Sequence, residues 1–404
     1  MKRLLTATAV AALLAGPALA QSDDVKIGVL LAFTGPLESL APPIAAGAEL
    51  AMKEVSDSGK LLAGVDGKDS AGLKVVPVRG DDTCVDAAAA TAAAERLVTS
   101  DGVKAIVGAM CSGVTGAVLS NVAMPNGIVM ISPSATSPGL SSVEDNGLFF
   151  RTSPSDARQG DIMAQIILDR GLKDVAVTYT NNDYGKGLAD SFQKAFEEMG
   201  GKVTLSAPHE DGKADYSAEI GALAAAGGEA LVVAGYVDQG GSGIIRAALD
   251  TGAFDLFVLP DGMVADALTE KFGDEIDGSF GQLPGSESEG GDKFLEMAKA
   301  AGFDGTSVYS KEAYDAAALI MLSMEAAKST SSNDFKSKVM DVANAPGEKI
   351  YPGELAKALQ ILADGGDVDY VGASAVELIE PGEAAGVYRE IEIDDGKIVT
   401  MGYR

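Results

Sequence analysis

A short apolar segment, a turn of small residues and then a helix-forming segment recur along this chain. In the first set the apolar segments are KIGVLL, LKVVPV, KAIVGA and IVMIS, at residues 26–31, 73–78, 104–109 and 128–132. Segments with helical periodicity lie between them, including residues 44–56 and the alanine-rich residues 86–98. Short apolar strands that alternate with helices are typical of a parallel sheet covered on both faces. The first part of the chain is therefore predicted to form a doubly wound α/β unit.

The same pattern starts again after FFRTSPSD (149–156). A predicted helix at residues 156–170 comes first, and the further apolar segments are DVAVTYT, KVTLSAP, ALVVAG and LFVLP, at 174–180, 202–208, 230–235 and 256–260. Single hydrophobic cores stop growing at about 250 to 300 residues, and this chain has 404. We therefore expect two doubly wound α/β lobes.

The last third of the chain is predicted to complete both lobes. The segment SFGQLPGSESEGG (279–291) is rich in Gly, Ser and Pro, which predicts a linker. Helices are expected near 292–301 and 308–328, and AVELI, GVYREIEI and KIVTMGY predict hairpins near the end of the chain. The expected lobes are residues 21–150 with 283–345, and residues 151–282 with 346–404.

The N-terminal segment MKRLLTATAVAALLAGPALAQ has the features of a secretory signal peptide. A basic start precedes an apolar run of about a dozen residues and then Ala18-Leu19-Ala20, a small-x-small pattern. A transmembrane anchor needs about 20 apolar residues, so this run is too short for one. Residues 1–20 are predicted to be removed by cleavage after Ala20, which places the mature protein in the periplasm.

The charge of the chain limits its partners. Acidic residues number 59 against 31 basic ones, a formal net charge of −28. Such a surface repels nucleic acid and anionic membranes, so neither is expected as a partner. An anionic small molecule is still compatible with this charge, because local groups govern binding in a closed site.

Residues suited to catalysis are few. The chain has two cysteines, Cys84 and Cys111, and one histidine, His209. In an exported protein a cysteine pair favours a disulfide, the alternative being free or reactive thiols. His209 is in the polar segment SAPHEDGKADY and is predicted to be a surface residue. Because no GxSxG elbow, HExxH, P-loop or spaced metal-ligand cluster occurs, we expect no catalytic residue, cofactor or metal.

Polar residues at the predicted strand ends indicate a binding site, since open parallel sheets bind ligands beyond the carboxyl ends of their strands. In the first set, CSGVT and SPSATSP place the hydroxyls of Ser112 and Thr136 at strand-to-helix turns. Either these residues are helix N-caps, or they bind a carboxylate together with open backbone N–H groups. In the second set, Tyr184, Tyr236 and Asp261 follow strands, and Asp261 can oppose a cation. Together these residues suit a small zwitterion.

The order of the motifs resembles a known family. IGVLLAFTGPLESL, DDTC, CSGVT, GIVMISPSATSP, FFRTSPSD, NDYGKG and GYVDQGG together resemble the leucine/isoleucine/valine-type periplasmic substrate-binding proteins of ABC transporters. The likeness covers nearly the whole mature chain. It implies a type I periplasmic-binding fold, in which three crossovers join two lobes around a cleft, and a disulfide between Cys84 and Cys111. The expected partners are an amino-acid ligand and an inner-membrane ABC permease, and the chain is expected to act as a monomer.

The resemblance also implies roles for the strand-end residues. Ser112, Ala135 and Thr136 match the residues that hold the α-carboxylate of the ligand. Tyr184 and Tyr236 match tyrosines of two loops, and Asp261 matches the acid that receives the α-ammonium. This acid is commonly a glutamate in the family, so direct contact from the shorter Asp261 is left open.

One position departs from the family. Relatives often place an aromatic residue beside the ligand side chain after TGPLES, where this chain has Leu40. This leaves the identity of the ligand open, with Glu38 or Ser39 as alternative contacts.

Three functions are compatible with the sequence. The first is a binding protein that captures a branched-chain or related amino acid by hinge closure, or alternatively a short amide, urea, or an aromatic or aliphatic carboxylate. The second is an exported hydrolase, which needs a nucleophile with a positioned base. A disulfide removes the thiols that such an enzyme would use. The third is a sensory domain that acts through a separate membrane partner.

Overall fold

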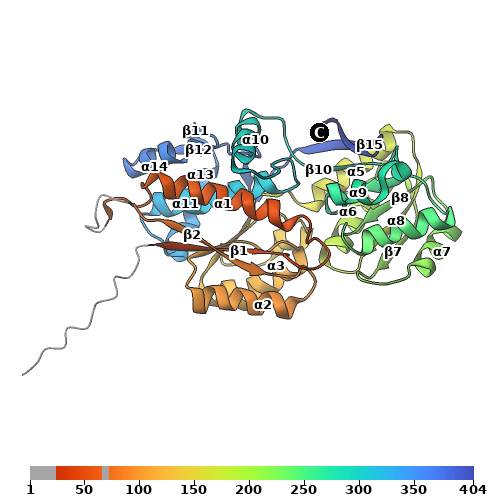
Figure 1. Cartoon of the computed structure of the whole chain (residues 1–404), viewed down its shortest axis with the longest axis horizontal. Helices are drawn as coiled ribbons and strands as arrows, with labels where there is room; N and C mark the ends of the chain where they lie inside the picture. The colour runs from red at the N-terminus through yellow and green to blue at the C-terminus, as the bar shows by residue number, and fades with distance from the viewer. Residues whose placement is uncertain (1–23, 66–71) are drawn as a thin grey trace, which may run out of the picture.

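The computed structural model describes residues 24–65 and 72–404, so the predicted signal peptide lies outside the described residues. The chain folds into two lobes that lie side by side (Figure 1). The strands of the first lobe are β1 Val25–Leu31, β2 Val75–Asp81, β3 Ala105–Gly108, β4 Val129–Ser132, β5 Phe149–Arg151, β13 Leu378–Ile379 and β14 Glu383–Ala384. Its helices from the first half of the chain are α1 Ala41–Ser58, α2 Ala87–Glu95, α3 Ser112–Val118 and α4 Met124–Asn126.

The second lobe repeats this arrangement. Its strands are β6 Asp174–Thr180, β7 Lys202–His209, β8 Ala230–Ala234, β9 Phe257–Leu259, β10 Phe280–Pro284, β15 Tyr388–Asp394 and β16 Lys397–Tyr403. Its helices are α5 Asp156–Asp169, α6 Asp183–Glu198, α7 Ser217–Ala226, α8 Gly240–Thr251, the 3-10 turn η5 Asp261–Met263 and α9 Asp266–Phe272.

A third group of elements follows the second lobe and packs on the first. It consists of α10 Glu289–Ala301, α11 Ser310–Ala327, α12 Ser332–Phe335, α13 Val339–Ala343, β11 Glu348–Ile350, α14 Leu355–Ala363 and β12 Val368–Tyr370. Helix α11 is buried almost throughout, because YDAAALIMLSM has apolar residues on every face and its buried Asp315 accepts a hydrogen bond from the hydroxyl of Tyr370 at 2.7 Å. It packs against α1 and α14, so this late segment supplies the core helix of the first lobe.

The two sheets confirm the predicted doubly wound α/β lobes. The first has the strand order β13-β14-β5-β4-β3-β1-β2 and the second β16-β15-β10-β9-β8-β6-β7. In both, the central strands are parallel and covered by helices, so their side chains are buried on both faces. The carboxyl ends of these strands carry the loops that form the site.

Three connections join the lobes, as predicted. The chain passes from β5 to α5, from β10 to α10 and from β14 to β15. Loops at these crossovers are short, so the lobes stay together while their relative angle can change.

The predicted linker at 279–291 is wrong in its first part. Residues 280–284 form β10, which is fully buried and lies between β9 and β15. The glycine of this strand is needed for packing, since a Cβ on Gly281 would lie 1.8 Å from the carbonyl oxygen of Leu259. Phe280 and Leu283 are buried in the core, and this apolar content outweighs the turn-forming composition.

The lobe boundary predicted at residue 346 is also too early. Strands β13 and β14 belong to the first sheet, and only β15 and β16 belong to the second. Helix α14 packs against α11 and α1, because its buried residues Leu355, Leu359 and Leu362 form one apolar face. The chain therefore returns to the second lobe only after residue 384.

Candidate ligand-binding site

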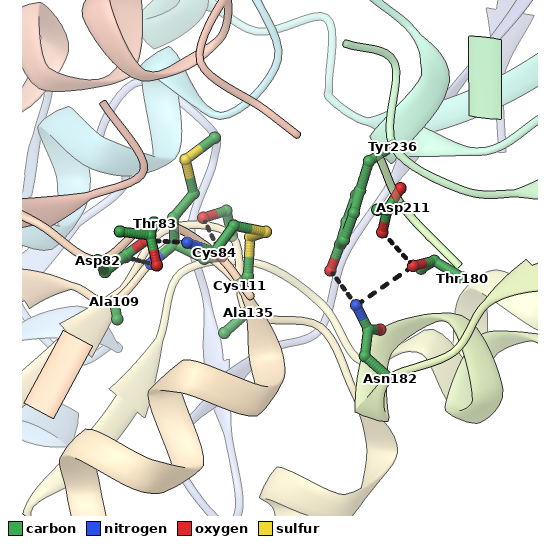
Figure 2. Close-up of a disulfide and its surroundings, with 12 residues drawn as sticks. Asp82, Thr83, Cys84, Ala109, Cys111, Ala135, Thr180, Asn182, Asp211 and Tyr236 are labelled. Atoms are coloured by element: carbon green, nitrogen blue, oxygen red, sulfur yellow. Dashed lines mark hydrogen bonds between the residues drawn. A yellow bond between two sulfur atoms is a disulfide. The ribbon is translucent and has the colours of Figure 1, made fainter. Parts of the chain in front are cut away.

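A disulfide supports the first-lobe side of the site. Cys84 follows β2 and Cys111 follows β3, and their Cα atoms are 5.0 Å apart in the bonded pair. Figure 2 shows this disulfide on the first lobe. It joins the loops on either side of β1, since β1 lies between β3 and β2. The predicted Cys84–Cys111 bond is confirmed.

A buried carboxylate holds the same two loops. Asp82 accepts hydrogen bonds from the backbone N–H of Met110 at 2.7 Å and of Cys84 at 3.0 Å. Burial raises the pKa of Asp82 to about 6, although these two bonds favour its ionised form. The turn that leads into Ser112 is thus held by one covalent bond and two hydrogen bonds.

Ser112 begins α3 and is buried. Its hydroxyl oxygen accepts the N–H of Ser137 at 3.0 Å, which leaves the hydroxyl hydrogen for a ligand. Ser134 is close by and donates to the carbonyl of Met110 at 2.8 Å. Both serines line the cavity between the lobes.

The other two residues predicted to hold a carboxylate lie behind this wall. The N–H of Ala135 donates to the hydroxyl of Ser132 at 2.9 Å. The Thr136 hydroxyl faces the Asp156 carboxyl without reaching hydrogen-bond geometry. Neither Ala135 nor Thr136 is among the residues that line the cavity.

Arg151 positions this loop from behind. Its guanidinium donates to the carbonyls of Ala135 at 3.0 Å and Ser137 at 2.9 Å. It also pairs with Glu383 of β14 at 2.5 Å, with the Arg151 side chain only 1% exposed. One buried arginine therefore links the loop at residues 135–137 to Glu383, close to a crossover between the lobes.

Asp261 is the charged residue on the second-lobe side. It begins η5 and is 2% exposed. Its carboxylate accepts hydrogen bonds from Gln159 Nε2 at 2.9 Å, from the hydroxyl of Tyr184 at 2.9 Å and from the hydroxyl of Tyr309. Burial raises its pKa, and the three donors oppose this shift. A carboxylate has about four acceptor positions, so one remains for a ligand cation.

Two tyrosines form a flat wall beside Asp261. The rings of Tyr184 and Tyr236 stack with their centroids 5.2 Å apart and their planes 11° apart. The hydroxyl of Tyr236 accepts from Asn182 Nδ2 at 3.2 Å. Figure 2 shows, opposite the disulfide, that Asn182 Nδ2 also donates to the hydroxyl of Thr180, which in turn donates to the carboxylate of Asp211. The ring of Tyr236 is thereby fixed facing the cleft.

The cavity enclosed by these groups is lined by both lobes. Four predicted residues, Ser112, Tyr184, Tyr236 and Asp261, are on its wall. The remaining wall residues are Leu37, Leu40, Met110, Cys111, Ser134, Gly262 and Tyr309. The cavity measures about 20 Å³, which is the space that one water needs. A molecule larger than a water therefore needs the lobes to move apart before it can enter this cavity.

The segment around Leu40 contributes in two ways. Leu40 lines the cavity, and the neighbouring Ser39 donates its N–H to the carboxylate of Asp238 at 2.8 Å across the cleft. The N–H of Asp238 donates in turn to the carbonyl of Pro36 at 3.1 Å. Glu38 is exposed and does not line the cavity. These bonds join the first lobe to the second at the rim of the cavity.

Sequence reasoning assigned no role to Asp156, Gln159 and Tyr309. Asp156 is fully buried beside Asp261, and its burial together with the Asp261 charge raises its pKa well above the usual range. Asp156 is the last residue of FFRTSPSD, a motif that contributed to the family resemblance but did not indicate a buried carboxylate beside Asp261. Tyr309 precedes α11, more than 45 residues after Asp261 along the chain, and only the fold brings the two together.

His209 is not the predicted surface residue. It ends β7, is 1% exposed and forms a 2.9 Å hydrogen bond through Nδ1 with the hydroxyl of Thr178. Gly235 and Gly240 pack against the imidazole ring of His209 and so cover it. Burial lowers its pKa to about 4. It does not line the cavity.

The described residues contain no group of three or more His, Cys, Asp or Glu side chains suited to a metal ion. Within the same part of the chain, no helix is long and apolar enough to cross a bilayer.

The family described as "Periplasmic binding protein" matches residues 24–349. The chain belongs to this family. A relative of this periplasmic binding protein is the Leu/Ile/Val-binding protein homolog 1 of Brucella melitensis, 34% identical over 355 residues that cover 86% of this chain and 88% of the relative.

Solved structures show the same fold. A leucine binding protein from Thermotoga maritima superposes with a TM-score of 0.77 at 22% identity, covering 94% of this chain and 98% of that one. A solute binding protein from R. palustris in complex with benzoate superposes with a TM-score of 0.74 at 19% identity, covering 94% and 96%. The type I fold predicted for this periplasmic binding protein is thus confirmed, and its family consists of binding proteins.

Proposed function

We propose that this protein captures an amino acid with a small or branched apolar side chain between its lobes and delivers it to an inner-membrane ABC permease. The observation that carries the proposal is the pairing of opposite polarities in one buried cavity. Ser112, a hydroxyl donor at a helix start, is on the first-lobe wall, and the carboxylate of Asp261 is on the second. Such a pair matches the carboxylate and the ammonium of a zwitterion.

The rest of the wall favours an apolar ligand side chain. Leu37, Leu40 and Met110 supply aliphatic and thioether surface, and the tyrosine pair supplies an aromatic face. Among the described residues on the wall, Asp261 is the one with a carboxylate, so a charged ligand side chain finds no second carboxylate there. The name of the Brucella relative, which refers to leucine, isoleucine and valine, supports the same ligand class.

A carboxylate without an amine is the second candidate ligand, favoured by the benzoate bound to the R. palustris protein. Such a ligand would use Ser112 and the apolar wall. It would gain nothing from Asp261, because an ionised carboxylate repels it. The two candidates therefore differ in whether Asp261 contributes to binding.

Isothermal titration calorimetry with leucine, valine and benzoate tests this difference. In Asp261→Asn the charged partner of the ammonium is lost, and leucine affinity is expected to fall by about 10 to 100-fold, corresponding to a charge-assisted hydrogen bond of about 1.5 to 3 kcal/mol. Glu38→Gln changes an exposed carboxylate of the same rim and is expected to bind leucine like the wild type. Tight benzoate binding that Asp261→Asn leaves unchanged, with no leucine binding, would establish the second candidate instead.

Export and assembly belong to the same proposal. We infer that residues 1–20 are removed and that the mature protein acts in the periplasm as a monomer. N-terminal sequencing of the exported protein is expected to begin at Gln21, and light scattering is expected to give the mass of one chain. A hydrolase would need a thiol or another activated nucleophile; a thiol titration of the unreduced protein is expected to find none, since both cysteines are in the disulfide.

A further inference from the structure

Arg389 of β15 has an unusual environment. Of the described arginines, it is the one with no hydrogen bond and no ion pair to another described residue, whereas Arg79, Arg151 and Arg246 all pair with glutamates. It is also half-buried, and this burial lowers its pKa. A guanidinium that gives up part of its hydration without a protein partner is suited to an anionic ligand.

Arg389 lines a groove between the lobes that is separate from the ligand cavity. We define the Arg389 groove by Pro42 and Pro43 of the first lobe, residues 264–267 and Leu283 of the second, and the loop 303–308. Its volume is about 520 Å³, within the range of about 300 to 1,000 Å³ that small-molecule sites occupy. Leu40 separates the Arg389 groove from the ligand cavity and lines both.

The chemistry of the groove fits a small carboxylate. Ser307 and Thr306 also line the groove, and Phe303, Val308 and Ile398 add apolar surface. The Thr306 hydroxyl donates to Asp304 at 2.7 Å, so Ser307 is the hydroxyl donor left for a ligand. A planar guanidinium binds a carboxylate through two parallel N–H···O bonds. One guanidinium, the Ser307 hydroxyl and an apolar wall together match a carboxylate with a short apolar chain.

The acidic residues near the groove set a limit on the ligand. Asp266, Glu270 and Asp304 also line the groove, so a second negative charge on the ligand, which the single guanidinium would not pair, would be repelled. Glu312 lines the adjoining hollow with Arg389 but forms no ion pair with it, and burial raises the pKa of Glu312 to about 7. The ligand is thus expected to carry a single carboxylate.

We propose that the Arg389 groove is a second binding site, distinct from the amino-acid cavity, that takes a small monocarboxylate through the Arg389 guanidinium. Because the groove is bounded by both lobes, a carboxylate there contacts the same rim that moves when the cleft closes. The site uses no residue of the proposed amino-acid site except the shared wall at Leu40.

Ligand-observed NMR with sodium butyrate as the probe tests this proposal. The full mature protein is expected to bind butyrate in the millimolar range, and Arg389→Gln is expected to weaken this binding at least about tenfold, as loss of a bidentate charged pair predicts. Arg158→Gln removes a more exposed arginine that bonds only the carbonyl of Gly386 and is expected to leave butyrate binding unchanged. Equal melting temperatures of the variants would show that they are folded.

Two results would overturn the proposal. One is butyrate binding that survives Arg389→Gln but is lost in Ser112→Ala, since the probe would then occupy the amino-acid cavity. The other is that the wild type shows no binding at butyrate concentrations up to about 100 mM, far above the millimolar dissociation constant expected. Neither result depends on leucine, so failure of the amino-acid proposal and failure of this one are distinguishable.

Discussion

The position and the ionisation of the Asp261 carboxylate depend on the side chains that donate hydrogen bonds to it. Tyr309 reaches it from the start of α11 with a backbone φ of +66°, a conformation that a non-glycine residue rarely adopts. This backbone conformation sets the position of the Tyr309 hydroxyl on the cavity wall. The tyrosine both orients the carboxylate and keeps it ionised, because its hydrogen bond lowers the pKa of Asp261.

Tyr309→Phe is therefore expected to weaken leucine binding about 5 to 10-fold, the value of one hydrogen bond of about 1 kcal/mol. Calorimetry at pH 7 measures the change. The control is Tyr314→Phe on the same helix, which loses a bond to Glu54 away from the cavity and is expected to retain full affinity. Equal affinity of Tyr309→Phe and wild type would mean that Tyr309 only fills space.

His209 is expected to make the fold sensitive to acid. Burial holds its folded pKa at about 4, whereas an unfolded histidine titrates near 6.5. Between these values the unfolded state binds more protons, so stability falls as pH drops from about 6.5 to about 4. The shift corresponds to about 3 kcal/mol.

Urea unfolding of wild type and His209→Asn at several pH values tests this expectation. The asparagine can keep a hydrogen bond to Thr178 but does not titrate. The stability difference between the two proteins is expected to move in favour of the variant as the pH falls through this window. Buried carboxylates with raised pKa, such as Asp82 and Asp315, shift stability in the opposite direction, and they cancel in the comparison because both proteins contain them. A constant difference would contradict the role of His209.

For single residues, the sequence predicted cavity residues that directly follow a strand better than residues that come from distant parts of the chain. Ser112, Tyr184, Tyr236 and Asp261 line the cavity because strand ends converge at one edge of each sheet. Tyr309 could not be predicted in this way, since its position depends on how α11 packs on the first lobe. The sequence likewise could not show that the N–H of Ala135 donates to Ser132 within its own loop and is therefore not open to a ligand.

Among the elements, the loop between β3 and α3 depends on the disulfide. The bond encloses a 27-residue separation, for which the chain-entropy estimate is about 3 to 4 kcal/mol. Reduction is expected to lower the free energy of unfolding by about this amount and to weaken ligand binding by loosening Ser112. Urea unfolding with and without reductant measures the first effect. The double variant Cys84→Ser/Cys111→Ser is the control, and it is expected to be insensitive to reductant.

The link between β5 and β14 depends on Arg151. Removing this arginine leaves Glu383, which is 14% exposed, with an uncompensated charge. Arg151→Met is expected to lower stability by about 3 to 5 kcal/mol, as for other broken buried pairs. Adding Glu383→Gln is expected to recover part of the loss, because the unpaired charge is then removed. Thermal unfolding of the two variants distinguishes this from a loss of packing alone, in which case the second substitution would recover nothing.

Strands and helices with a clear period were predicted well, whereas composition misled at β10. Glycine and proline around this strand are typical of a linker, yet Gly281 is required by the close approach of β9. Strand β13 lies within AVELI, where a strand is expected, but β13 and β14 have two residues each, too few to indicate which sheet they join. Their place in the first sheet is set by pairing with β5, which no local pattern encodes.

For the whole molecule, hydrogen bonds at the rim join the two lobes across the cleft. The carboxylate of Asp238 accepts the N–H of Ser39 across the lobes. This bond exists only when the lobes are together, so it favours the closed form over the open one.

Asp238→Ala is expected to shift the free protein towards the open form and to weaken leucine binding about 2 to 10-fold, corresponding to a hydrogen bond of about 0.5 to 1.5 kcal/mol. Small-angle X-ray scattering of the free protein measures the first effect, as a larger radius of gyration, and calorimetry measures the second. Asp183→Ala serves as the control, because Asp183 begins α6 and its side chain forms no hydrogen bond with a described residue of the first lobe. An unchanged radius together with unchanged affinity would exclude the contact as a determinant of closure.

The late return of the chain to both sheets has a consequence for how the protein is made. The first sheet receives β13 and β14 from residues 378–384, and the second receives β15 and β16 from residues 388–403. Since a domain forms during synthesis only when its strands have emerged, neither sheet can be completed before residues 378–403 have emerged. A growing chain of this topology therefore keeps both lobes incompletely folded until these late strands are available.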